Sequence, residues 1–224
     1  MTIKDRKHWA TKSEAARDEV RDFVEEFVDW LILRRREAAW ASAGVLAAAL
    51  VAGLLLYGRR SRVNAAWDKL SQAEFYASSD RATEARTLLS QVVEEKDARA
   101  ASALASLLQG DLHYPRGEYD QALADYDKAA QDAPEALRPY ALADKVMALE
   151  AAGKSADCAA AAQSFLDAAP DHLMAARVQV ALARCQLAQG RSEAAKSTLQ
   201  RLSARYPNTR WSEWANARLK TASR

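Results

Sequence analysis

The pattern of apolar and polar positions divides the chain into three zones. Residues 38–57 are an uninterrupted apolar run without a charged residue. On both sides of this run, apolar residues recur every three or four positions, which is the spacing of amphipathic helices. Alanine is the commonest residue, and only seven glycines and five prolines punctuate the chain. Since alanine favours helix and turn-forming residues are few, the pattern predicts an all-α protein.

The apolar run AAWASAGVLAAALVAGLLLY has the length of a transmembrane helix, because twenty helical residues span about 30 Å. Arginine clusters bracket it, and Trp40 and Tyr57 occupy its ends, where aromatic rings prefer the headgroup layer. A buried core helix would rarely carry arginines at both ends. A cleavable signal peptide is also not expected, because its n-region would be thirty-odd residues long and no clear small-residue cleavage site follows the apolar run. We therefore predict a transmembrane helix over residues 37–58, in contact with membrane lipid through residues 38–57.

The N-terminal segment, residues 1–36, is predicted to form an acidic amphipathic helix. Thr11 and Glu14 have the spacing of a capping box, and a face of apolar residues follows. The opposite face is mostly acidic, whereas a helix lying on anionic lipid would carry lysine and arginine. Two interpretations stay open: a helix that binds a partner or associates with itself, giving a homo-oligomer, and an amphipathic lead-in to the membrane.

Beyond the apolar run, glycine and proline recur in register. Gly117, Gly153 and Gly190 lie 36 and 37 residues apart, and each is followed seventeen residues later by a proline: Pro134, Pro170 and Pro207. This period is typical of stacked helix pairs, in which glycine opens the turn and proline follows the second helix. The chain here resembles the tetratricopeptide repeat, with Ala122 and Ala195 at the alanine position of the second helix. An α-solenoid is expected over residues 59–208, closed by a capping helix over residues 209–224.

Four repeats are expected, at about residues 63–97, 100–135, 137–171 and 173–208, the first of them degenerate because it has neither the glycine nor the proline. In tetratricopeptide arrays the first helices line a concave surface that binds peptides or helices of partner proteins. Transferring those positions predicts a protein-binding face formed by Trp67, Leu70, Leu104, Leu107, Tyr114, Tyr140, Met147, Arg177 and Arg184. The alternative is that many of these side chains simply pack in the core.

Two cysteines, Cys158 and Cys185, fall on neighbouring antiparallel helices of the predicted repeats. Each lies five residues from a turn glycine, so the two should lie at the same height. We expect them to be close, either as a disulfide or as two small buried residues. A disulfide would indicate an oxidising compartment.

The charge and the catalytic residue types argue against several functions. The net charge of +2, with acids and bases interspersed, gives no basic surface of the kind that binds nucleic acid. His8, His113 and His172 lie far apart without ligand-spaced neighbours, and neither a nucleophile motif nor a phosphate-binding glycine loop is present. The sequence therefore predicts neither an enzyme nor a catalytic, metal or cofactor site.

The order of an acidic N-terminal segment, one span and then repeats is similar to the bacterial YfgM family, ancillary subunits of the SecYEG translocon, and the sequence ALASL at Ala103–Leu107 matches that family locally. The C-terminal PNTRWSEWANARL instead resembles the closing helix of periplasmic repeat proteins related to a Tol-Pal-associated division coordinator. These resemblances imply an inner-membrane protein with a cytoplasmic N-terminus and periplasmic repeats. Its expected role is a chaperone-like adaptor for translocon subunits, periplasmic chaperones or secreted clients.

Two other functions remain open from the sequence. The N-terminal helix and the small residues of the span could self-associate, which would make the protein a structural scaffold of an envelope or division complex. The repeats could also face the cytoplasm as a docking platform, because the arginine clusters on the two sides of the span are equal.

Overall fold

The computed structural model describes residues 35–222, so the predicted acidic helix around Thr11 and Glu14 lies outside the described residues. The described part of the chain contains nine α-helices, one 3-10 turn and no β-strand, which confirms the all-α class. The elements are α2 (Arg35–Ser78), α3 (Ala82–Val93), α4 (Arg99–His113), η1 (Tyr114–Arg116), α5 (Tyr119–Asp132), α6 (Arg138–Ala151), α7 (Ser155–Ala168), α8 (Ala175–Ala188), α9 (Ser192–Arg205) and α10 (Arg210–Ala222).

The chain divides into two compact units, Met1–Gly58 and Arg59–Arg224. Helix α2 runs across the boundary, and its N-terminal part belongs to the first unit. By length and composition, α2 includes a segment apolar enough to cross a membrane. The large apolar side chains from Val45 to Leu56 are between 54% and 70% exposed, so this segment is not the buried core helix of a soluble fold.

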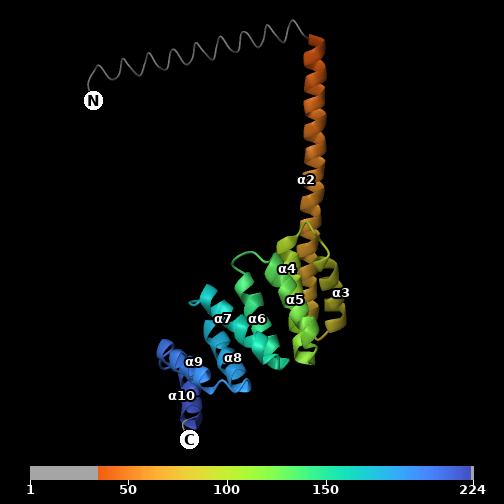
Figure 1. Ribbon diagram of the computed structural model, residues 1–224. Helices are drawn as coiled ribbons and strands as arrows, with labels where there is room; N and C mark the ends of the chain where they lie inside the picture. Colours follow the sequence, from red (N-terminus) through yellow and green to blue (C-terminus); the bar gives the residue numbers. More distant parts are fainter. Residues whose placement is uncertain (1–34, 223–224) are drawn as a thin grey trace, which may run out of the picture. The chain divides into compact units, whose positions relative to one another are not determined.

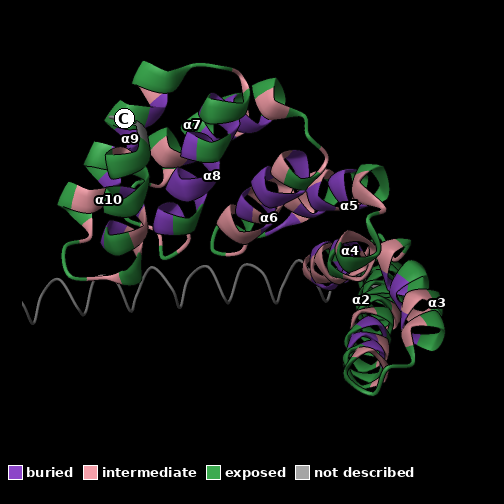
Figure 2. Ribbon diagram, turned by 90° about the horizontal axis from the view of Figure 1, so that it is seen from below, coloured by how far each residue is buried: buried purple, intermediate pink, exposed green. Residues whose placement is uncertain are grey.

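The second unit is a solenoid of antiparallel helix pairs (Figure 1). The pairs are the C-terminal part of α2 with α3, then α4 with α5, α6 with α7, and α8 with α9, and α10 packs against α9 and α8. Buried residues lie where neighbouring helices face one another (Figure 2). Helix α8 is buried over most of its length because it contacts helices of its own pair, of the preceding pair and of the cap.

The turns inside the four pairs are built alike. Gly117, Gly153 and Gly190 adopt φ angles of 71 to 74°, the left-handed conformation that glycine reaches without a steric penalty. In each pair the residue directly after the one with positive φ donates its backbone N–H to the carbonyl five residues earlier, as Lys154 does to Leu149 at 3.0 Å. This is the long bond of a Schellman helix end, and it satisfies a carbonyl that the helix terminus leaves free.

The first pair uses aspartates where the others use glycine and proline. Asp80 lies 37 residues before Gly117, has a φ of 59°, and is followed by the same turn bond, from Arg81 N–H to the Tyr76 carbonyl. Asp97 stands seventeen residues later, at the proline position, where its carboxylate accepts a hydrogen bond from Arg62 Nε at 2.7 Å. Aspartate tolerates the left-handed conformation, so this repeat keeps the turn geometry without glycine.

The crossing of the two helices in each pair joins residues sixteen positions apart whose sizes are complementary. At Gly110 an added Cβ would lie 2.4 Å from the Tyr126 ring, so only glycine fits. In the next pair the order is reversed, with Val146 on the first helix and Ala162 on the second, both fully buried. The other pairs have alanine on the first helix and leucine on the second: Ala73 with Leu89, and Ala183 with Leu199. The valine that departs from the repeat pattern is therefore compensated across the crossing.

We expect Gly153→Ala to lower the free energy of unfolding by about 1 to 2 kcal/mol, because an alanine would have to adopt the left-handed conformation. A Cβ there would touch nothing within 4 Å, so the loss is a backbone effect alone. Gly153→Asn should lose less, and Asp80→Gly should change stability by under about 0.5 kcal/mol. Urea unfolding of the three variants measures these differences, and equal losses for alanine and asparagine would contradict the explanation.

We expect Ala162→Leu to destabilise the protein by about 1 to 3 kcal/mol, because the added atoms overpack the crossing with Val146. The single variant Val146→Ala should also destabilise it, by leaving a cavity. The double variant restores the alanine and leucine arrangement of the neighbouring pairs and should recover most of both losses, as measured in a double-mutant cycle. Additive losses in the double variant would show that the two side chains do not share one packing site.

Candidate functional site

The concave side of the solenoid contains a cavity of about 490 Å³ formed by the first helices of successive pairs and the capping helix. Its lining residues come from η1, α6, α8 and α10 and are Tyr114, Met147, Glu150, Ala151, Arg177, Val180, Arg184, Arg210 and Trp211. We call the concave surface that includes this cavity, together with Asp111 and Asp144 beside it, the groove. Four of the residues that the sequence assigned to a protein-binding face lie together here: Tyr114, Met147, Arg177 and Arg184.

The repeat register explains why these side chains meet. Met147 and Arg184 each lie six residues before their turn glycine, and Asp111 and Glu74 occupy the equivalent places before Gly117 and Asp80. Because the four helix ends share one turn geometry, equivalent positions of successive first helices fall on the same side of the solenoid.

The other predicted residues lie elsewhere. Leu70 is only 2% exposed and belongs to the core formed by α2, α3 and α4. Leu104 and Leu107 are half-buried and pack against core clusters. Tyr140 places its ring edge-on to His172, with ring centroids 4.9 Å apart, and Trp67 is 40% exposed on α2. None of these five side chains lines the cavity.

Helix α10 contributes two groove residues that the sequence analysis treated only as part of a cap. Arg210 and Trp211 line the cavity, with the Arg210 guanidinium 4.4 Å from the Trp211 ring centroid. Trp211, Trp214 and Leu219 also pack against the core of the last pair. The sequence signal was the close spacing of arginine and tryptophan at the helix start, which is typical of interface anchors as well as of caps.

Asp111 on α4, Asp144 on α6 and Arg177 on α8 interact electrostatically at the side of the cavity. Burial, followed by the neighbouring Asp111 carboxylate, raises the pKa of the Asp144 carboxyl to about 6, while Arg177 acts in the opposite direction. Desolvation also raises the pKa of Asp111, partly offset by a hydrogen bond that Tyr126 donates at 2.9 Å. Asp111 remains open to solvent although helices surround it, as expected for a residue on a concave surface.

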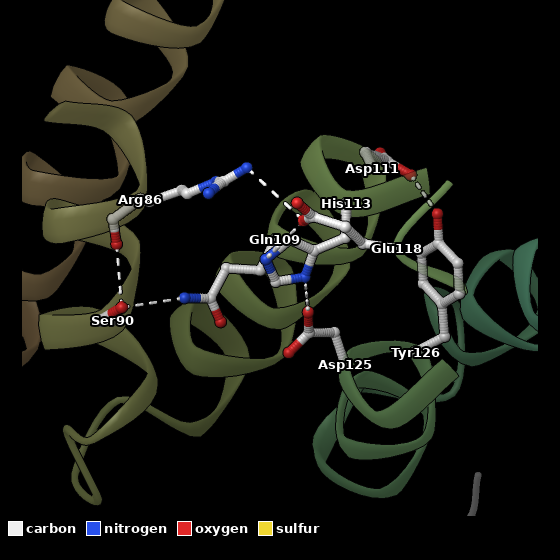
Figure 3. A network of polar contacts seen from close by, with 8 residues as sticks. All are labelled: Arg86, Ser90, Gln109, Asp111, His113, Glu118, Asp125 and Tyr126. Carbon is white, nitrogen blue, oxygen red and sulfur yellow. Dashed lines mark hydrogen bonds and ion pairs between the residues drawn. The ribbon is translucent and has the colours of Figure 1, made fainter. Parts of the chain in front are cut away.

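A polar network centred on His113, two residues after Asp111, connects α4 to its neighbouring helices (Figure 3). His113 Nδ1 lies 2.9 Å from Asp125 Oδ2, and burial raises the pKa of that carboxyl. Glu118 lies within 4 Å of both His113 Nε2 and the Arg86 guanidinium, and Gln109 donates a hydrogen bond to Ser90 at 3.1 Å. These contacts tie α4 and α5 to α3 across the boundary between two repeats.

Cys158 on α7 and Cys185 on α8 form a disulfide with their Cα atoms 6.2 Å apart. Both residues are buried, and Cys158 occupies the fully buried alanine position represented elsewhere by Ala85, Ala122 and Ala195. The bond links the third pair to the fourth, whose first helix carries Arg177 and Arg184. It therefore ties to the third pair the helix that supplies two of the three arginines of the cavity.

The helix pairs, their turns and their crossings define an α-solenoid of the tetratricopeptide type. Residues 149–220 match the sequence profile of the tetratricopeptide repeat. Two crystal structures of the nearly identical TPR-like repeats of a Podosopora anserina "putative kinesin light chain" have the same fold. One, a single-substitution variant, has a TM-score of 0.56 at 16% identity, covering 69% of this chain and 83% of its own. The other has a TM-score of 0.55 with the same identity and coverage. No curated protein sequence matches the chain.

We expect Asp144→Asn to stabilise the protein at about pH 7.5 but not at about pH 4. The folded pKa of about 6 lies above the ordinary value of 3.8, so the folded state binds this proton more tightly and loses stability as pH rises through that interval. Allowing for solvent screening, the gain at the higher pH should be about 1 kcal/mol.

Urea unfolding at the two pH values measures this gain, with the exposed Asp68→Asn on α2 as the matched control. A gain for Asp144→Asn that is equal at both pH values would contradict the assignment, because the amide would then act through something other than the lost charge.

Proposed function

We propose that this protein is a membrane-anchored adaptor that binds segments of other proteins in its groove. The observation that carries the proposal is the groove itself, a cavity of about 490 Å³ lined by aromatic, apolar and arginine side chains from four elements. Aromatic residues and arginine are the types that dominate protein interfaces. Tetratricopeptide solenoids generally act as interaction scaffolds without catalytic activity, which agrees with this use of the fold.

The N-terminal part of α2 supports the membrane anchor in this proposal. Its leucine and valine side chains are exposed all around the helix, with Leu46, Leu54 and Leu55 at 64% to 70%. Such a surface is unfavourable in water and stable in a bilayer, where the backbone bonds are satisfied within the helix.

We further propose that the solenoid faces the periplasm of a bacterial cell and assists secreted or envelope proteins beside the translocon. The Cys158–Cys185 disulfide supports an oxidising compartment. The resemblance of the overall layout to translocon-associated repeat proteins supports the secretion role.

In vivo photocrosslinking tests the adaptor function. A photoreactive amino acid at Arg184, in the groove, should form adducts with translocon subunits, periplasmic chaperones or exported chains, identified by mass spectrometry. The matched control is the same amino acid at Lys196, which is exposed on the second helix of the same pair. Adducts to this chain alone would favour the scaffold function, and equal adducts from both positions would refute a groove-specific adaptor.

The compartment has its own test in the same cells. Protease added to spheroplasts should degrade a periplasmic solenoid, and Cys158 and Cys185 should resist maleimide labelling until a reductant and denaturant are added. A protected solenoid with two thiols that label after denaturation alone would instead place the repeats in the cytoplasm.

A further inference from the structure

The charge of the groove changes sign along the solenoid. At the position six residues before each turn, successive helices carry Glu74, Asp111, Met147 and Arg184, which is a progression from acidic through apolar to basic. The neighbouring charges follow the same order, since Asp144 lies on α6 and Arg177 on α8. The groove thus has an acidic part over α4 and α6 and a basic part over α8 and α10.

Several of these charges form no close ion pair within the part of the chain that the structure describes. Arg184 pairs with Glu150 at 3.2 Å, but Arg177, Arg210 and Asp144 form no ion pair within 4 Å with any residue that the structure describes. Asp111 and Asp144 repel one another, and Arg177 offsets this repulsion only in part, so a further cation beside the two carboxylates would relieve an unfavourable interaction. Charge without a close counter-ion on a concave surface favours a ligand of complementary charge.

The basic part of the groove also has apolar surface. Trp211 and Tyr114 line the cavity with Val180 and Met147, and Arg210 lies over the Trp211 ring. An acidic residue would meet the arginines there, and an aromatic or aliphatic neighbour would meet the rings. Asp111 and Asp144 are not among the residues that line this cavity, so the contribution of the acidic part would be mainly electrostatic.

We propose that the groove binds a peptide segment of bipolar charge, with acidic and aromatic residues in the cavity between α8 and α10 and a lysine or arginine against Asp111 and Asp144. This inference rests on the proposed function, because it names the kind of partner that the groove takes. The three spacings between α4, α6, α8 and α10, each about 8 to 10 Å, would be spanned by about seven to nine extended residues.

Fluorescence anisotropy with the full-length protein in detergent micelles tests the proposal. One labelled peptide has lysines at one end and glutamates with a tryptophan at the other. A second has the same composition with the charges alternating, and a third replaces the lysines with glutamines. The segregated peptide should bind about tenfold more tightly than either of the others, and the difference should shrink in high salt.

Two groove variants locate the ends of the peptide. Arg210→Gln should weaken the segregated and the lysine-free peptides alike, whereas Asp144→Asn should weaken only the segregated peptide. Matched controls are Arg191→Gln, exposed at the turn before α9, and Asp157→Asn, exposed on the first turn of α7, and neither should alter binding.

Equal affinity for the three peptides, or an Asp144→Asn effect that persists without the peptide lysines, would overturn the bipolar assignment. If no peptide binds while Arg184 still crosslinks to partners in cells, the bipolar inference fails and the adaptor function stands. If groove crosslinks are also absent, both fail.

Discussion

The close crossing of the two helices in each pair is the contact on which the rest of the solenoid depends. A pair has no core of its own beyond this crossing, and its remaining apolar faces must be buried by the next pair. The crossing requires one small side chain at each site, as Gly110 against the Tyr126 ring shows. Since this contact sets the angle and distance of each pair, it also sets how the first helices line up along the groove.

The groove follows from that alignment, but its chemistry comes from positions that packing leaves free. Arg177 and Arg184 are exposed on a helix most of whose residues are buried, and both line the cavity. The disulfide ties α8 to α7, and the polar network around His113 ties α4 to α3 and α5 (Figure 3). Both groove-forming helices are thus fixed by contacts with their neighbours. Asp111 and Arg177 keep their charges there without a close ion pair because solvent reaches both side chains.

Of the nine side chains that the resemblance to a tetratricopeptide array assigned to the binding face, four line the cavity and five lie outside it. Leu70 occupies a concave register position, yet it is buried because α2 begins the array and packs onto both α3 and α4. Trp211 was missed as a groove residue because a capping helix has no repeat register from which to infer its orientation. Asp80 was missed as a turn residue because the pattern named glycine, whereas the backbone requires only a residue that tolerates positive φ.

The sequence by itself determined the helical class, the positions of the turns and the apolar run before the repeats, because these depend on local properties: helix propensity, the φ freedom of glycine and the length of a charge-free segment. Only the tertiary structure decided which charges share the groove, how Val146 is accommodated, and that α10 supplies part of the cavity. Those features depend on side chains from different repeats meeting at particular distances, and a single repeat motif contains no information about its neighbours' surfaces.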